Sequence, residues 1–148
     1  MEMPDISGQT RIWQRVRGEQ VPVTEGLPAL VAAALTEAAI YGVLARRTQG
    51  PAREMLQQLR EQEWAHARCM KGIYVLVTGT PLTVTAPTPE VEQTEIALRK
   101  CYGNSLRALA AYEGKMGREE YGPVFEMLAA REREHCRKIT EIAGLLCV

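Results

Sequence analysis

The sequence carries no excess of charge of either sign, because 18 lysines and arginines are matched by 18 aspartates and glutamates. A protein that binds nucleic acid needs a basic face to neutralise phosphates, so a nucleic-acid partner is not indicated. The four cysteines, Cys69, Cys101, Cys136 and Cys147, are scattered and form no CxxC pair. The sequence therefore encodes neither a zinc knuckle nor a rubredoxin-type iron centre, and we expect free thiols in a reducing compartment.

Long apolar runs are also scarce. We expect no membrane-spanning helix, which would need roughly 20 predominantly apolar residues. The N-terminal stretch MEMPDISGQTRIW lacks the apolar segment of a signal peptide. These features predict a soluble, cytoplasmic protein with no membrane partner. A chain of 148 residues can bury the core of one domain, and we divide it into an N-terminal arm, residues 1–25, and a folded domain, residues 26–148.

Proline and glycine divide the folded domain into four periodic stretches, which predicts an all-α fold. The expected helices run from about Leu27 to Gln49, from Gly50 to Thr78, from Thr88 to Tyr121 and from Gly122 to Leu146. The two Gly-Pro pairs each end one helix and open the next, because glycine accepts a left-handed backbone and proline suits the first helical turn. The segment TGTPLTVTAPTPE has no helical pattern and predicts a long connection.

Apolar stripes with alternating steps of three and four residues predict that the helices form a bundle. Polar residues interrupt each stripe. The second helix carries Glu63 and His66 on its stripe, and the fourth carries Glu132 and His135. The first stripe contains Glu37, and the third we place along Leu98, Tyr102, Leu109, Glu113 and Met116.

A carboxylate buried alone in such a core costs several kcal/mol or becomes neutral. The stripes carry no matching set of lysines or arginines, so a cation from outside the chain is the simpler compensation. Both histidines of the chain lie three residues after a glutamate, which projects each pair to one helix face. The alternative is a core network in which the histidines donate hydrogen bonds to the glutamates.

The heights of the four glutamates along the bundle also agree. Glu37 and Glu63 each lie 13 residues from Gly50, while Glu113 and Glu132 lie nine and ten residues from Gly122. At about 1.5 Å per residue the two pairs lie roughly 20 Å and 14 Å from their turns. All four meet at one level if the turns are at opposite ends of the bundle, so the long connection must run the length of the bundle.

The ordered pattern Glu, ExxH, Glu, ExxH, found in LTEAAIY, EQEWAH, AAYEGKM and EREHC, resembles the ferritin-like superfamily and most closely its rubrerythrin-like branch. The resemblance covers about Leu27 to Leu146. It implies a ferritin-like four-helix bundle of two antiparallel helix hairpins joined by a long crossover, with a site for two iron ions or, alternatively, manganese. The implied metal ligands are Glu37, Glu63, His66, Glu113, Glu132 and His135.

In this resemblance Glu63 and Glu132 bridge the metals and each histidine binds one. Glu113 has two neighbouring alternatives, Glu119 and Glu120, which lie close to the second turn. Tyr41, one turn after Glu37, is a candidate for hydrogen bonding to a ligand near the metals, although an ordinary core tyrosine is an equal alternative.

The resemblance also implies an oxidoreductase that passes two electrons from the metal pair to peroxide or dioxygen. Met116 stands where rubrerythrins carry a further glutamate, and the rubredoxin domain is missing, so turnover needs an external electron donor such as a rubredoxin-like protein. Iron oxidation and storage is an alternative. A further alternative is a metal-stabilised helical bundle without enzymatic activity, which binds a partner through the N-terminal arm and Trp13. The sequence is also compatible with a homodimer.

Overall fold

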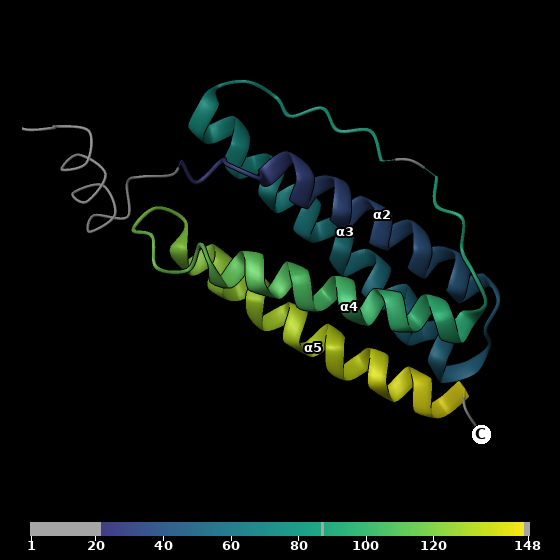
Figure 1. Cartoon of the computed structure of the whole chain (residues 1–148). Coiled ribbons are helices and arrows are strands. Elements are labelled where there is room, and N and C mark those ends of the chain that lie inside the picture. Colours follow the sequence, from purple (N-terminus) through teal and green to yellow (C-terminus); the bar gives the residue numbers. More distant parts are fainter. Residues whose placement is uncertain (1–21, 87, 147–148) are drawn as a thin grey trace, which may run out of the picture.

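The computed structural model describes residues 22–86 and 88–146, and within them the chain forms four α-helices and no strand. The helices are α2 (Leu27–Arg46), α3 (Gly50–Thr78), α4 (Thr94–Glu113) and α5 (Gly122–Leu146), which form a bundle (Figure 1). The prediction of an all-α four-helix bundle is confirmed. Most of the N-terminal arm lies outside the described residues, and residues 22–25 form the turn that leads into α2.

The helices pack as two adjacent pairs, α2 along α3 and α4 along α5. Short connections join the members of each pair, whereas the connection from α3 to α4 runs along the length of the bundle (Figure 1). Both Gly-Pro turns require glycine. Gly50 has a φ of 70°, and a Cβ atom on Gly122 would lie 2.6 Å from the carbonyl oxygen of Met116.

The helix α4 is shorter than predicted at both ends. It begins at residue 94 rather than 88, because the preceding backbone is fixed to the end of α2. Arg47 donates from Nη1 to the carbonyl of Glu92 (2.6 Å) and from Nη2 to the carbonyl of Val91 (2.9 Å). The helix ends before Gly114, where turns begin, and does not continue to Tyr121.

Among the described residues, α2 is long and apolar enough to cross a membrane by length and composition. We expected no apolar run of about 20 residues, and the composition of α2 shows that this expectation was wrong. In the structure α2 buries nine residues, including Glu37, against the rest of the bundle. The core helix of a bundle meets the same criteria of length and composition.

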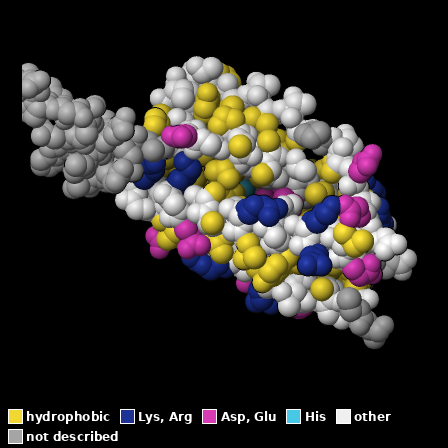
Figure 2. All heavy atoms as spheres, in the orientation of Figure 1, with side chains coloured by type: hydrophobic (Ala, Val, Ile, Leu, Met, Phe, Trp, Pro, Cys, Tyr) yellow, Lys and Arg dark blue, Asp and Glu magenta, His cyan; other side chains and the backbone are white. Residues whose placement is uncertain are grey.

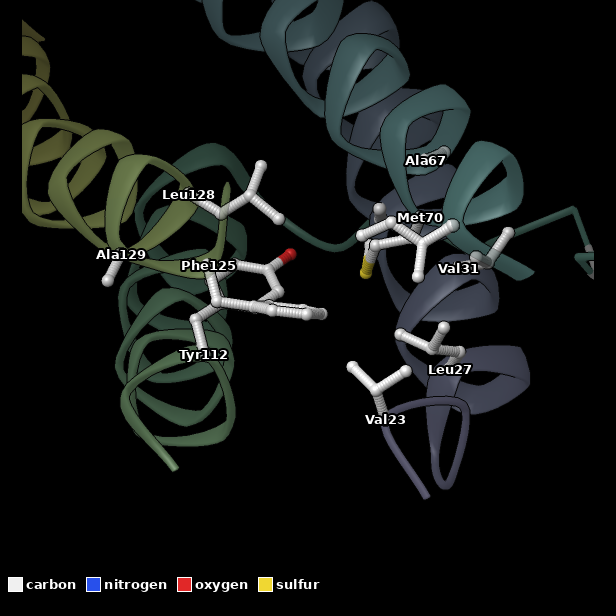
Figure 3. Packing of buried hydrophobic residues seen from close by; sticks show 11 residues of the cluster. Val23, Leu27, Val31, Ala67, Met70, Tyr112, Phe125, Leu128 and Ala129 are labelled. Carbon is white, nitrogen blue, oxygen red and sulfur yellow. The ribbon is translucent and has the colours of Figure 1, made fainter. Parts of the chain in front are cut away.

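Two apolar clusters fill the bundle, one on each side of a polar layer. The first includes Leu27, Met70 and Phe125, and Figure 3 shows Phe125 and its neighbour Tyr112 directed toward Met70 across the core. The second cluster contains these buried residues: Tyr41, Leu44, Ala45, Ala52, Leu56, Leu59, Ala97, Leu98, Cys101, Ile139 and Ile142. The polar layer is thus enclosed along the bundle axis by packed apolar side chains.

Phe125 tests the contribution of the first cluster, because its ring is wholly buried. Phe125→Ala is expected to lower the free energy of unfolding by about 3–5 kcal/mol, measured by urea denaturation. Met127→Ala is the matched control on the same helix, since Met127 is 39% exposed. Equal midpoints for the two variants would contradict the assignment of the core.

Candidate metal centre

Five ionisable side chains meet in the polar layer between the two apolar clusters. They come from α2, α3 and α5, and they are Glu37, Glu63, His66, Glu132 and His135. All five are buried. The three-residue spacing on α3 and α5 places each glutamate and histidine on one helix face, and the apolar residues of the same stripes turn that face inward. The structure therefore brings together five of the six predicted ligands.

The Nδ1 atom of each imidazole faces both paired carboxylates. His66 Nδ1 lies 3.2 Å from Glu132 Oε1 and 3.9 Å from Glu63 Oε2. His135 Nδ1 lies 3.0 Å from Glu63 Oε1 and 3.4 Å from Glu132 Oε2. The two rings stack with centroids 5.3 Å apart and planes 8° apart. Glu63, Glu132 and His135 each offer a ligand atom within 4.8 Å of the others, so this group could hold a metal ion.

Glu113 does not join this group. Its side chain is 48% exposed, and its Oε2 lies 3.9 Å from Arg133 Nη2. The alternatives Glu119 and Glu120 are exposed as well. The stripe that we predicted on α4 was wrong at Tyr102, which is 40% exposed, and at Glu113, whereas Leu98 on the same stripe is buried.

The buried residues of α4 follow a different line: Ala97, Leu98, Cys101, Ser105 and Tyr112. Glu113 comes one residue after Tyr112, and one residue rotates a helix by about 100°. The Glu113 side chain therefore faces away from the core.

Three polar side chains that we did not predict support the ligands. His135 Nε2 donates to Gln62 Oε1 at 2.6 Å, so loss of the second ring proton would free the Nδ1 lone pair for a metal. Asn104 donates from Nδ2 to Glu37 Oε1, and Arg107 donates to Asn104 Oδ1. Asn104 is next to Ser105, which is buried on α4. A sequence stripe drawn through the buried residues of α4 would therefore have indicated Asn104. No sequence signal distinguishes Gln62.

Two tyrosines border the layer. Tyr41 is wholly buried one turn after Glu37, and its hydroxyl has no hydrogen bond of ordinary geometry in the described part of the chain. Burial raises the pKa of Tyr41 well above its usual value, so the phenol stays neutral. Tyr112 meets the His66 ring edge-on, with centroids 6.1 Å apart. Tyr41 thus keeps both predicted alternatives, a hydrogen-bond donor near the centre and an ordinary core residue.

Burial controls the protonation of the metal-free layer. It raises the pKa of Glu37 to about 7, raises the pKa of Glu63 and lowers the pKa of His66. Burial also opposes charge on Glu132 and His135, but their polar contacts within the layer prevail. Contacts with His135 and His66 hold the pKa of Glu132 below its usual value, and contacts with Glu132 and Glu63 raise the pKa of His135 to about 9. A protonated imidazole therefore balances an ionised carboxylate in the layer.

The remaining polar atoms of the layer fit a divalent metal. Glu37 Oε2 and Glu132 Oε2 are buried without a hydrogen-bond partner in the described residues. Over the same residues, Glu63 and Glu132 form their ion pairs with histidine and not with lysine or arginine. The buried Lys115 instead donates to backbone carbonyls before α2. Carboxylate oxygens with imidazole nitrogens are a ligand set that suits iron and manganese.

Metal binding is expected to release protons, because His135 and Glu37 must lose theirs to become ligands. Their pKa values of about 9 and about 7 mean that acid favours the metal-free form. The apparent affinity for Fe(II) should therefore rise from pH 6 to pH 8. Anaerobic calorimetry in two buffers of different ionisation enthalpy measures the protons released. Equal affinity at both pH values, with no proton release, would contradict this protonation scheme.

A cavity of about 400 Å³ opens between α2 and α4 and reaches the layer, where Glu37, Glu63 and Glu132 line it. Figure 2 shows acidic and histidine side chains at the bottom of a hollow on this face of the molecule. The ligand-type side chains are thus enclosed along the bundle but accessible from one side.

These features define a four-helix bundle with a buried glutamate and histidine cluster that could hold metal. No family model, curated protein or solved structure matches the chain. The resemblance to rubrerythrin-like proteins therefore stays a prediction from the ordered residues, and the geometry of the cluster carries the functional argument.

Proposed function

We propose that the chain is a ferritin-like di-metal carboxylate protein of two antiparallel helix hairpins joined by a crossover. Its function would be the reduction of peroxide or dioxygen with electrons from an external donor. The observation that carries the proposal is the convergence of both histidine Nδ1 atoms on the same two buried carboxylates, Glu63 and Glu132. Two ions that share these carboxylates would each have one imidazole ligand.

Glu63, Glu132, His66 and His135 would hold the ions, with Glu37 as a further ligand, as the resemblance to rubrerythrin-like proteins implies. Asn104 holds Glu37 through one oxygen and leaves Oε2 unpartnered. Iron is the preferred metal for electron transfer to peroxide, with manganese as the alternative.

A bound iron pair supplies two electrons at the site. Reduction of hydrogen peroxide consumes these electrons and two protons, breaks the O–O bond and forms two water molecules. The chain contributes enclosure, since the two apolar clusters limit water in the layer. An external donor, such as a rubredoxin-like protein, would then return two electrons.

The cavity favours a catalytic metal site rather than a purely structural one. A structural site normally has its coordination closed by protein ligands, whereas a catalytic site keeps access for small molecules. Here the cavity reaches three carboxylates. We also propose a reducing, cytoplasmic compartment, which suits the free thiols of Cys69, Cys101 and Cys136.

The proposal is tested by loading the protein with two equivalents of Fe(II) without oxygen and adding one equivalent of hydrogen peroxide. Oxidation of both iron ions should consume one peroxide, and the absorbance of protein-bound ferric iron should appear. Reduced rubredoxin should then restore the ferrous spectrum. Peroxide consumption no faster than by the same iron in buffer would overturn the proposal.

A further inference from the structure

The two helix pairs contribute unequally to the proposed metal centre. Two of its glutamates lie on α2 and α3 and one lies on α5, whereas the buried line of α4 contains no carboxylate. Facing Glu37, α4 instead presents Asn104, which donates to Glu37 Oε1. Three carboxylates offset only three of the four positive charges of two divalent ions. The loaded centre therefore keeps one positive charge, which an anion from outside the chain would neutralise.

The space on the α4 side of the centre is the cavity of about 400 Å³. Its inner end is formed by Glu37, Glu63 and Glu132. Within the described residues, the buried atoms Glu37 Oε2 and Glu132 Oε2 have no hydrogen-bond partner. A ligand that enters this hollow (Figure 2) would meet the metals where the chain provides no fourth carboxylate.

The lining of the cavity combines small apolar side chains with a positive charge. Ala33, Ala34 and Ala108 form part of its wall, and the exposed Arg107 lies at its rim. Arg107 donates from Nη2 to Asn104 Oδ1, which uses one of the five N–H donors of a guanidinium group. The wall suits a short alkyl chain, and the positive charge at the rim favours the entry of an anion.

We infer that this cavity binds a small monocarboxylate, with the carboxylate directed to the metal centre and a short apolar chain along the alanine wall. The volume lies near the lower end for small-molecule sites, which favours an acid of a few carbon atoms. The inference rests on the proposed function, because the centre has its positive charge only when it is loaded with metal.

Butyrate is the probe for this inference. Full-length protein is loaded anaerobically with Fe(II), its iron content is measured, and butyrate binding is followed by calorimetry on the same sample. We expect one butyrate per chain, with butyramide, its neutral analogue, bound at least tenfold more weakly. Metal-free protein should bind butyrate at least tenfold more weakly as well.

Substitutions at Arg107 and Ala108 test the rim and the apolar wall of the cavity separately. Arg107→Gln should weaken butyrate binding less than Ala108→Leu does, because Arg107 lies at the rim whereas the carboxylate lies at the inner end of the cavity. Ala108→Leu should weaken butyrate binding at least tenfold, because the larger side chain narrows the cavity along its alanine wall. Ala108→Leu should keep the wild-type iron content, because Ala108 is not a ligand. The iron content of Arg107→Gln is measured as well, since Arg107 donates to Asn104, which holds Glu37. Arg53→Gln, an exposed change on α3, is the matched control and should leave butyrate binding unchanged.

The outcomes distinguish this inference from the proposed function. Two iron ions per chain with no butyrate binding, or with equal binding of butyrate and butyramide, would overturn the inference alone. Undiminished butyrate binding by Ala108→Leu would overturn the location of the ligand. Absence of iron binding would overturn the proposed function and the inference with it.

Discussion

The double substitution Glu63→Ala with His135→Ala is expected to abolish iron binding while the helical content is retained. It removes one bridging carboxylate and one imidazole from the group whose ligand atoms lie within 4.8 Å of one another. Loss of a supporting residue alone costs metal sites about 10–100-fold in affinity, so loss of two direct ligands should cost more. Circular dichroism checks the fold, and iron analysis after desalting measures the loss.

Glu113→Ala is the matched control for the double variant. Glu113 was a predicted ligand, but it is half exposed and faces Arg133. We expect this variant to keep the wild-type iron content and stability, because an exposed ion pair contributes about 0–1 kcal/mol. Undiminished iron loading in the double variant, or loss of iron in Glu113→Ala, would show that the site lies elsewhere.

Glu37→Met is expected to stabilise the metal-free protein while it weakens metal binding. The pKa of Glu37 rises from 4.5 to about 7 on folding, because the carboxyl group is buried. A raised carboxyl pKa means that the folded state is favoured below pH 4.5 and loses that advantage as the pH rises through 7. The cost of ionising the buried group is about 3 kcal/mol at pH 8. Methionine removes this cost and keeps a similar volume.

Urea denaturation of metal-free protein at pH 5 and pH 8 measures this effect. The increase in the free energy of unfolding caused by Glu37→Met should be larger at pH 8 than at pH 5. The affinity for Fe(II) should fall about 10-fold or more, since one oxygen ligand is lost. Asn104 loses its acceptor but is only half buried, so water can replace that hydrogen bond. A metal-free variant less stable than wild type at pH 8 would contradict the assignment of Glu37 as a buried, uncompensated carboxylate.

Sequence periodicity predicted those parts of the molecule where the apolar pattern and the ligand pattern lie on the same helix face. On α3 and α5 the stripe through each ExxH pair is long and continuous, so the burial of Glu63, His66, Glu132 and His135 could be predicted. Glu37 on α2 followed from the same reasoning. Strong amphipathic patterns leave one orientation that buries the apolar side chains.

The pattern on α4 is ambiguous, and there the prediction failed. The predicted stripe ran from Leu98 through Tyr102 to Leu109 and Glu113. The structure buries the line with Cys101 and Ser105 instead. Small residues there leave room for the cavity beside the centre. The buried face of α4 therefore borders a hollow and not a filled core, so the large apolar side chains on this helix do not mark that face.

Contacts between distant helices could not be predicted from periodicity. Gln62 reaches His135 and Asn104 reaches Glu37 across 73 and 67 residues of sequence. Such pairs depend on the rotation and spacing of packed helices, which a single stripe does not determine. The start of α4 depends in the same way on Arg47, which fixes the preceding carbonyls.

The iron content per chain, after purification with and without oxygen, tests the central claim most directly. The cluster of two imidazoles and three buried carboxylates predicts about two metal ions per wild-type chain. The absorbance of bound ferric iron should appear only in the air-exposed sample, and the Glu63→Ala with His135→Ala variant should contain no metal. A fully folded wild-type protein that binds no more metal than this variant would contradict the assignment of a metal centre.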